Sequence, residues 1–591
     1  MSRWKFAGQM AVIVAAVVII YIPAMRAGFV WDDEPLVTKN PLLRSVAGLG
    51  EIWAGGRIAD YFPLTNNLFW LEYQAFGLNA AGYHIVNVLL QAADAVLIWV
   101  VLRRLGAPGA WLAALIFGIH PVHVESVAWI SELKNTLSML FFGLAILAWL
   151  EFEAEAPRRL RPPVAYGVAL LCFLCACLAK TQVVVLPALL LLWAWWRAPA
   201  ERHARSQFVR RELLRTLPFF ALAAVLSLVT IWFQRRGLGG EQVIVGSFAR
   251  RLANAAAAVW WYLCKVFAPI SLTTVYRPWR FDAPSVASFA PLLALCTAMV
   301  TLAAASRRRR LPRAVLAALA YFVLMLLPVL GFFAMAYARS GTIVADHFQY
   351  FSDISMIALF CAALSWASKM ESPRLRFGVH AVVVLVVTSA GAYSYERAGV
   401  YRDEETLWRD NFAKNPDTWQ GHNRIGQIRF DAGKFADAAE HFQRAAKLKP
   451  GIADNHNALG LALCRLGQFN EGIAEYQKAL AQKAGHSNAD AGAATIHMNL
   501  ANALAFLANN AADAGDESWR TTARYEGAIR EYEVVLALTP RSAAAHRNLG
   551  IVFARTGRIE EAVRHLRIVL ELAPNEPLAR EALKAIEEQR R

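Results

Sequence analysis

The stretch YHIVNVLLQAADAVLIWVVL, residues 83–102, contains a single charged residue and ends at Arg103 and Arg104. Twenty mostly apolar residues in a helix are long enough to cross the hydrocarbon core of a bilayer. Ten further apolar blocks occupy the first two thirds of the chain: 9–27, 110–122, 135–150, 164–179, 182–196, 216–233, 289–305, 314–333, 350–368 and 378–394. The pattern predicts an all-α, polytopic membrane domain of about eleven spans at residues 1–395.

The composition supports a membrane region and excludes a soluble globular enzyme for the first two thirds of the chain. Of 591 residues, 57% are hydrophobic and only 18% are charged, whereas an average soluble domain has about 25% charged residues. Beyond about residue 395, charges interrupt the apolar residues every three or four positions, which is typical of soluble amphipathic helices. A disordered or fibrous chain is excluded throughout.

The Lys and Arg residues predict the orientation of the spans. Basic clusters fall at every second junction between apolar blocks, and an excess of positive charge marks cytoplasmic loops. The clusters are Arg3 and Lys5; Arg103 and Arg104; Arg158, Arg159 and Arg161; Arg197 to Arg215; Arg307 to Arg310 with Arg313; and Lys369, Arg374 and Arg376. Eleven spans from a cytoplasmic N-terminus place everything past residue 395 outside. External loops are expected at about 28–82 and 234–288.

Residues 250–269 do not fit this pattern of spans. They are apolar enough to cross, but a crossing here would move the cluster at Arg307 to Arg310 to the outside. The block begins with two arginines, contains Lys265 and ends at a proline. We expect an interfacial or re-entrant helix within the external loop, and a twelfth span is the alternative.

A repeated phrase organises the last third of the chain. It reads HNRIG at 422–426, HNALG at 456–460, HMNLA at 497–501 and HRNLG at 546–550. Pro416 and Pro450 are 34 residues apart, as are Pro540 and Pro574, and 34 residues is the period of the tetratricopeptide repeat. We therefore expect a linker helix at 396–416 and about four repeats at 417–591. Wider spacing in the third unit predicts loops around 483–494 and 508–522.

Stacked repeats of this kind form a superhelix with a concave groove that suits an extended peptide or a partner helix. Four asparagines of the repeated phrase are candidates to bind a protein acceptor there: Asn423, Asn457, Asn499 and Asn548. The alternative is that they are solvated helix residues. No catalytic constellation is found in the repeats.

Acidic residues directly follow the first apolar block. Asp32, Asp33 and Glu34 are adjacent, and neighbouring carboxylates raise one another's pKa or require a cation. A carboxylate held at the membrane surface suits a general base that removes a proton from a hydroxyl group. It also suits a metal ligand, and a solvated start of a loop is the remaining interpretation.

Further ionisable residues gather at the ends of apolar blocks that are predicted to lie at the same face. The segment HPVHVE contains His120, His123 and Glu125, which could bind a divalent metal, or the two histidines could donate to a phosphate. Lys134 and Lys180 could meet a lipid phosphate or simply extend to the interface. Asp346 and His347 precede another block. Convergence of these groups predicts a site at the external face.

The chain resembles the transmembrane and tetratricopeptide-repeat-containing O-mannosyltransferases and their bacterial relatives over nearly its full length. Five stretches carry the resemblance: FVWDDEPLVTKNP at 29–41, FPLTNNLFWLEYQAFGLNAAGYHIVNVLL at 62–90, HPVHVESVAWISELKN at 120–135, AKTQVVVLP at 179–187 and ADHFQY at 345–350. The order of membrane region and repeats also agrees. The resemblance implies a GT-C class fold and a glycosyltransferase that takes its sugar, expected to be mannose, from a polyprenyl-phosphate-linked donor.

The resemblance also implies roles for residues of this chain. Asp32 and Asp33 occupy the acidic pair that supplies the catalytic base, and His120, His123 and Glu125 fill the HPxHxE motif, with Glu34 and Asp346 as supporting acids. Two positions depart from the family, which usually has arginine where this chain has Phe62 and His347. If those arginines bind the donor phosphate, other groups must do so here. The candidates are Arg57, Lys134, Lys180 and His347, with His120 and His123 as further donors.

The sequence thus predicts an inverting transferase that moves a sugar to Ser or Thr hydroxyls of a protein. No metal site, certain cofactor or nucleic-acid partner is expected. The protein is expected to be a multi-pass protein of a bacterial inner membrane with periplasmic repeats. One alternative is a transferase that acts on a lipid or glycan. The other is a non-catalytic membrane scaffold for envelope assembly.

Overall fold

The computed structural model describes residues 2–55, 61–155, 159–198, 202–237, 246–278, 284–308, 310–333, 342–483 and 491–590. Every element in these ranges is helical, so the all-α prediction is confirmed. The chain divides into two compact units. The first, which we call the membrane unit, comprises Met1–Leu238 and Gln242–Pro416, and the second, the repeat unit, comprises Asp417–Arg591.

Several helices of the membrane unit are long and apolar enough to cross a bilayer. Within the described ranges they number seven: α1 (Arg3–Ile20), α5 (Ala80–Arg104), α8 (Leu133–Glu153), α9 (Pro162–Ala179), α11 (Arg202–Gly237), α13 (Ala290–Arg307) and α16 (Pro373–Val400). A bent pair, α6 (Ala110–Gly118) with Pro121–Ala128, is a further candidate. Three shorter apolar helices are α10 (Leu186–Arg197), α14 (Arg313–Leu326) and α15 (Asp353–Ala367). The multi-pass membrane protein is confirmed, and the figure of eleven spans stays a prediction.

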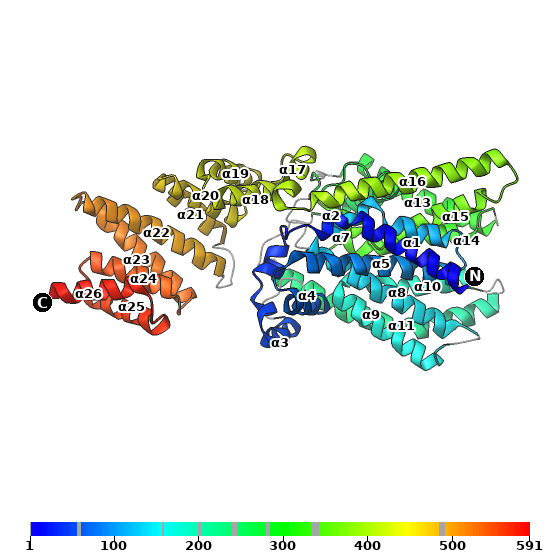
Figure 1. Ribbon diagram of the computed structural model, residues 1–591, viewed down its shortest axis with the longest axis horizontal. Coiled ribbons are helices and arrows are strands. Elements are labelled where there is room, and N and C mark those ends of the chain that lie inside the picture. Colours follow the sequence, from blue (N-terminus) through cyan, green and yellow to red (C-terminus); the bar gives the residue numbers. More distant parts are fainter. Residues whose placement is uncertain are drawn as a thin grey trace. The chain divides into compact units, whose positions relative to one another are not determined.

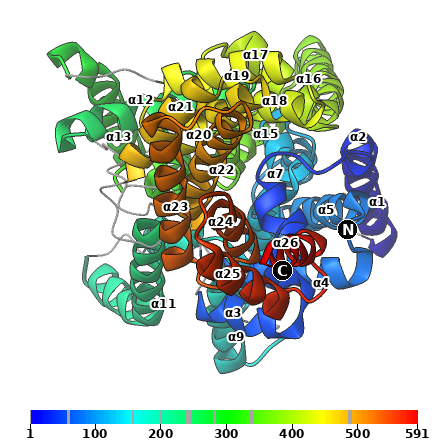
Figure 2. The same ribbon diagram turned by 90° about the vertical axis from the view of Figure 1, so that its left-hand side faces the viewer.

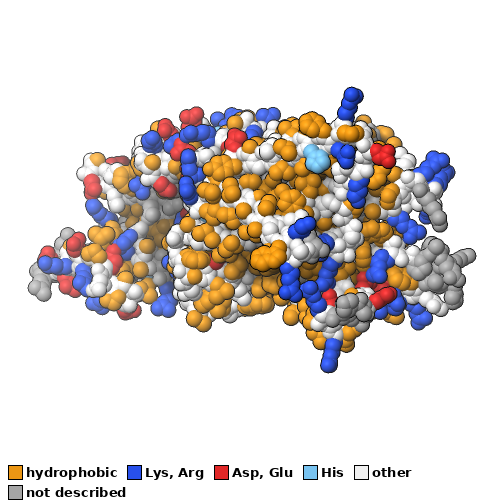
Figure 3. Space-filling view, turned by 45° about the vertical axis from the view of Figure 1, so that its right-hand side comes forward, with side chains coloured by type: hydrophobic (Ala, Val, Ile, Leu, Met, Phe, Trp, Pro, Cys, Tyr) orange, Lys and Arg blue, Asp and Glu red, His pale blue; other side chains and the backbone are white. Residues whose placement is uncertain are grey.

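The long helices of the membrane unit lie roughly side by side (Figure 1), and Figure 2 shows the same helices from one end. Hydrophobic side chains cover a broad part of the surface that Figure 3 shows, with many Lys and Arg side chains toward one side of it. Such a surface is what lipid chains require.

Helix α5 lies inside the membrane unit and contacts α1, α6 and α8. Its interior face carries the polar residues Asn87, Gln91 and Asp94, and each of these is fully buried. Their spacing of four and three residues places them on one face of the helix. The face meets a part of the chain where helical hydrogen bonding is interrupted.

That interruption lies between α6 and α8, where the chain bends by 45° and forms three short elements: η3 (Pro121–His123), α7 (Val124–Ala128) and η4 (Ile130–Glu132). The amide of Asn87 donates to the carbonyl oxygens of Ser126 and Val127, at 3.1 and 2.9 Å. The Gln91 amide does the same for Phe117 and Gly118, at 3.4 and 3.3 Å. Unpaired carbonyls are costly inside a membrane. Because the amides of Asn87 and Gln91 pair with carbonyls of the break, α5 can carry these polar residues on a buried face.

The first predicted external loop folds into short helices rather than irregular chain. They are η1 (Glu34–Thr38), η2 (Pro41–Arg44), α3 (Val46–Ala54) and α4 (Pro63–Phe76), and the short helix α2 (Ile22–Met25) precedes the loop. Val37, Leu43 and Phe69 bury their side chains in one cluster with Tyr83 at the start of α5. This cluster attaches the loop to the end of the spans.

Two other helices belong to the membrane unit. Residues 250–269, expected to lie in the interface, form most of α12 (Phe248–Phe267), which is not among the helices long and apolar enough to cross. Its interfacial position stays a prediction. Within the expected linker helix at 396–416, α16 continues to Val400 and the helix α17 (Glu404–Lys414) follows. The remaining short elements are η5 (Thr181–Val185), η6 (Val286–Phe289), η7 (Leu327–Val329) and η9 (Asp346–Phe348).

The repeat unit is a series of antiparallel helix pairs. Its helices are α18 (Trp419–Asp431), α19 (Phe435–Leu448), α20 (Ala453–Arg465), α21 (Phe469–Lys483), α22 (Ala491–Asp513), α23 (Trp519–Leu538), α24 (Ala543–Arg555), α25 (Ile559–Leu572) and α26 (Pro577–Arg590). The tetratricopeptide superhelix is confirmed. The loop expected at 508–522 is largely absent, since α22 continues to Asp513 and α23 begins at Trp519. In the described part of the third unit, extra residues therefore lengthen α22 and α23, and residues 484–490 of the loop expected at 483–494 lie outside the described ranges.

Small residues allow the two helices of a repeat to approach. A methyl group on Gly460 would lie 2.8 Å from the ring of Tyr476 and 2.9 Å from the carbonyl oxygen of Gly472. The second atom is backbone and cannot rotate away, so any side chain at position 460 must push α20 from α21. Gly451, in the preceding turn, has open space around it.

We expect Gly460→Val to destabilise the repeat unit by about 1–3 kcal/mol, the usual cost of overpacking a well-packed contact. The measurement is urea unfolding of residues 417–591 followed by circular dichroism. Gly451→Val is the matched control and should unfold near the wild-type midpoint. Equal midpoints for the two variants would show that α20 and α21 do not depend on this contact.

Candidate active site

The acidic turn after α2 is held by aromatic packing. Trp31 has a φ of 47°, a left-handed conformation that costs a non-glycine residue of order 1 kcal/mol or more. Its ring stacks on Trp129 with centroids 5.1 Å apart, and it meets the edge of Trp408 at 5.0 Å. These contacts hold the strained turn and direct Asp33 into the protein.

Asp33 is fully buried and accepts three hydrogen bonds. Its Oδ2 accepts from the Val30 amide at 2.9 Å, and its Oδ1 accepts from the amide of Ser131 at 2.8 Å and from the Ser131 hydroxyl. Burial raises the pKa of Asp33 to about 7, although these donors act in the opposite direction. Asp32, in contrast, is only half-buried. The two adjacent acids therefore have different surroundings: Asp33 joins the turn to η4, and Asp32 remains accessible.

Glu132, next to Ser131, is the centre of a buried charge cluster. Its Oε1 lies 2.8 Å from Nζ of Lys134 and 3.9 Å from Nε2 of His347. Its Oε2 lies 3.4 Å from Nζ of Lys180 and accepts from the Asn135 amide at 2.8 Å. Lys180 is buried, and Lys134 keeps 19% of its side chain exposed. Two ammonium groups thus share the Glu132 carboxylate.

The segment before α15 brings Asp346 and His347 beside Glu125 of α7. Glu125 Oε2 accepts from the amide of His347 at 2.9 Å and lies 3.2 Å from its Nδ1. Asp346 Oδ1 accepts from the hydroxyl of Tyr276 at 2.7 Å. Burial, with a further contribution from Glu125, raises the pKa of Asp346 to about 8. Segments around residues 33, 125, 132, 180 and 346 are therefore brought together by α7, η4, η5 and η9.

Phe62, where the resemblance leads one to expect arginine, lies beside this cluster. Nζ of Lys134 is 5.9 Å from the centre of the Phe62 ring. An ammonium at this distance from an aromatic face is weakly attracted to it. A cation is therefore present near Phe62, although it comes from α8 and not from the loop.

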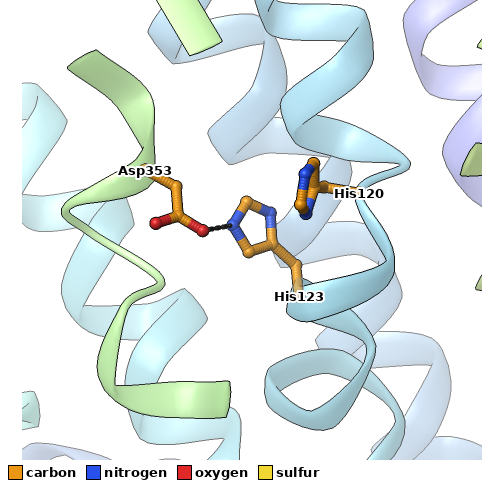
Figure 4. Close-up of side chains that lie close together, drawn as sticks. All are labelled: His120, His123 and Asp353. Carbon is orange, nitrogen blue, oxygen red and sulfur yellow. Dashed lines mark hydrogen bonds and ion pairs between the residues drawn. The ribbon is translucent and has the colours of Figure 1, made fainter. Parts of the chain in front are cut away.

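His120 and His123 form a separate group with Asp353 (Figure 4), and their nearest donor atoms lie within 4.8 Å of one another. Nε2 of His120 lies 3.0 Å from the carbonyl oxygen of Val266, so it must carry a proton, and Nδ1 accepts from the Val122 amide. Nδ1 of His123 donates to the carbonyl oxygen of Phe117, and its Nε2 faces Asp353 at 3.3 Å.

A metal ion would need a lone pair from each histidine. The two ring nitrogens of His120 are already used by Val266 and Val122, so His120 supplies none without breaking a hydrogen bond. His123 and Asp353 instead form a hydrogen-bonded pair that ties η3 to α15. The three residues fit a structural contact better than a metal site, and they do not join the Glu132 cluster.

The other candidates have different surroundings. Arg57 lies outside the described residues. Glu34 pairs with Lys39 near the surface. The four repeat asparagines bond across neighbouring repeats: Asn423 to Asn455, Asn499 to Asn457 and Asn548 to Asn502, at 2.9, 3.0 and 2.9 Å. Their amides thus join α18, α20, α22 and α24 in one row.

Sequence reasoning missed Ser131, Glu132 and Asp353. Ser131 and Glu132 lie in the stretch HPVHVESVAWISELKN. An expectation that the second half of this stretch is buried would have indicated that both residues need partners. Asp353 begins α15, where an acidic residue at a helix N-terminus has an ordinary explanation. Only the fold shows its pairing with His123.

Substitution by asparagine should have different effects on stability at Asp33 and at Asp32. In Asp33→Asn one acceptor oxygen becomes an NH2 group that faces donors on Val30 or Ser131, and we expect a loss of about 1–3 kcal/mol. Asp32→Asn is the matched control, since Asp32 is half-buried. Thermal melting in detergent micelles should show a lower midpoint for Asp33→Asn alone. Equal midpoints would contradict the anchoring role of Asp33.

Comparisons with known proteins bear on both units. Tetratricopeptide repeat models match residues 419–452 and 520–577. Solved structures also resemble part of the chain: a crystal structure of MamA protein covers 28% of this chain and 79% of its own, at 19% identity and a TM-score of 0.23.

Curated relatives match most of the chain at low identity. Protein O-mannosyl-transferase Tmtc3 of Drosophila melanogaster is 23% identical over 578 residues, which is 83% of this chain and 61% of the relative. Protein O-mannosyl-transferase TMTC4 of Homo sapiens is 24% identical, over 73% of this chain and 65% of the relative. Protein O-mannosyl-transferase TMTC3 of Mus musculus is 21% identical, over 80% of this chain and 54% of the relative.

This chain therefore spans between about half and two thirds of the length of these relatives. The matches extend over both the membrane unit and the repeats, and repeat models recognise the second unit independently. The chain is a distant homologue of the TMTC protein O-mannosyl-transferases and carries tetratricopeptide repeats.

Proposed function

We propose that this protein is a membrane glycosyltransferase that moves a sugar, mannose by analogy with its relatives, from a polyprenyl-phosphate donor to a hydroxyl group of a protein. The observation that carries the proposal is the Asp33–Ser131 contact. It joins the acidic turn after the first span to a segment 98 residues later, next to the cations around Glu132. An acid and an anion-binding group side by side are what transfer from a phosphate donor needs.

Asp32 is the general base in this proposal. It is the half-buried member of the pair, whereas Asp33 is fully buried and holds the turn against Ser131. Asp32 takes the proton of a Ser or Thr hydroxyl as the oxygen attacks the anomeric carbon. The bond from that carbon to the phosphate oxygen breaks, and polyprenyl phosphate leaves with the electron pair. Attack opposite to the leaving group inverts the anomeric carbon.

Lys134 and Lys180 bind the donor phosphate. Glu132 holds both ammonium groups within 3.4 Å of its oxygens, so they are in place before the donor arrives. Fixed charges of this kind stabilise the negative charge that develops on the leaving phosphate. His347, between Glu125 and Glu132, is the third donor and stands where relatives usually have arginine.

Placement at the external face follows from the arginine pattern. If eleven segments cross, including the bent pair and the three shorter helices, the acidic turn and the repeats lie on the same side. The repeats then bind the protein acceptor, with the row that contains Asn423, Asn457, Asn499 and Asn548 along its surface. The periplasmic side of a bacterial inner membrane fits this arrangement.

Asp32→Asn should reduce sugar transfer by about 10²–10⁴-fold, because the amide cannot accept the proton. The assay is transfer of labelled mannose from a polyprenyl-phosphate donor to envelope proteins, in vesicles that contain the purified protein. Glu51→Gln, an exposed acid of α3, is the control and should keep full transfer. Donor binding should survive in Asp32→Asn. Unchanged transfer would move the base to another acid, and Glu125 and Asp346 would be next.

Removal of residues 417–591 should separate the two units. The membrane unit has its own core, so we expect donor binding to be retained and transfer to a folded protein acceptor to be lost. A short Ser/Thr peptide at high concentration should still react slowly. Normal modification of the folded protein acceptor by the truncated protein would exclude an acceptor role for the repeats, which would then be better explained as a docking surface for other envelope proteins.

A further inference from the structure

A large cavity lies inside the membrane unit, away from the candidate active site. Its volume is about 320 Å³, which is in the range of about 300–1,000 Å³ typical of small-molecule sites. Its walls come from α5, α8, α10, α14 and α15, helices that Figure 1 labels within the membrane unit. None of the residues of the Glu132 cluster lines it.

The walls of the cavity are almost entirely apolar. Leu, Ile and Trp side chains of α5, α8 and α10 line it, together with small residues of α14 and α15 such as Ala317 and Ala358. The cavity extends from Asp94 to Leu105. At 1.5 Å per helical residue, these eleven steps correspond to about 16 Å. The space therefore suits an extended apolar chain.

Asp94 is the acidic residue among the lining side chains, and it is fully buried. Its Oδ2 is hydrogen-bonded to the Tyr350 hydroxyl at 3.0 Å. Its Oδ1 is buried without a hydrogen-bond partner among the described residues. Buried polar atoms of native proteins are almost always paired, so this oxygen points to a group that binds from the cavity.

The residues around Asp94 limit the charge and hydrogen-bonding character of the group that can bind to it. Gln91 uses its amide NH2 for the carbonyl oxygens of Phe117 and Gly118, so its Oε1 accepts from Tyr350. A carboxyl group in this network still has one oxygen that can accept a hydrogen bond, whichever way the Tyr350 proton points. A phosphate brings further negative charge and no cation lines the cavity. A hydroxyl group supplies one proton and no charge.

We propose that this cavity binds a lipid alcohol: a linear or isoprenoid chain occupies the apolar space, and its terminal hydroxyl donates to Oδ1 of Asp94. The inference goes beyond the proposed transferase activity and does not depend on it. The ligand differs from a phosphorylated donor by its uncharged end.

The test is equilibrium binding of tritiated farnesol to the full-length protein in nanodiscs, with empty nanodiscs subtracted. We expect saturable binding at one site. Ala317→Phe fills the cavity and should weaken binding at least tenfold, while Val300→Phe on the exposed face of α13 should not. Thermal melting of each variant reports whether it is folded. If Ala317→Phe is unstable, Ala358→Leu narrows the same wall with a smaller group.

The polar contact is tested separately by Asp94→Leu, in which Tyr350 keeps its partner Gln91. This variant should bind farnesol about tenfold more weakly and the hydrocarbon farnesene as the wild type does. Equal farnesol affinity in wild type and Asp94→Leu would overturn the proposal, because the cavity would then recognise apolar bulk alone. Displacement of farnesol by farnesyl phosphate at equal concentration would also overturn it, in favour of the tail of a phosphorylated lipid.

Discussion

Inside a bilayer, each backbone carbonyl that leaves a helix needs a hydrogen-bond donor from the protein. The break between α6 and α8 exposes several such carbonyls, and Asn87 and Gln91 of α5 supply donors for them. Ser394 of α16 supplies another, to the carbonyl oxygen of Ile119 at 2.7 Å. Because these bonds support the break, the chain can present residues 120–132 as short elements rather than as one continuous span.

The candidate site depends on that break. A straight helix through residues 110–132 would place Glu125 and Glu132 two turns apart on one face, because they are seven residues apart, and Ser131 would face another way. The separate elements α7 and η4 instead direct Glu125 toward His347 and Glu132 toward Lys134 and Lys180. Polar residues of α5 thus determine the geometry of charged residues that they do not touch.

Buried charges are costly unless they are paired, and a charge that loses its partner costs more than a pair that was never formed. Glu132 pairs with two ammonium groups and an amide, which is a reason for it to stay ionised beneath the surface. Asp94 differs from Glu132, because its hydrogen-bond partner among the described residues is the neutral hydroxyl of Tyr350. The same membrane unit therefore contains a cluster of paired charges and a cavity that is lined almost entirely by apolar side chains.

Much of this protein could be predicted from local pattern, since spans require long apolar runs and repeats require a period of 34 residues. The membrane helices, the tetratricopeptide repeats and the resemblance to the O-mannosyl-transferases all follow from such patterns. The difference between Asp32 and Asp33 could not be predicted, because adjacent residues of one type have the same local signal. Their roles depend on Ser131, which is distant in the chain. Likewise, local pattern indicates no more than that Glu132, His123 and Asp94 are polar residues near a membrane. The partner that each one meets is visible in the fold alone, because long-range pairing depends on how the helices pack.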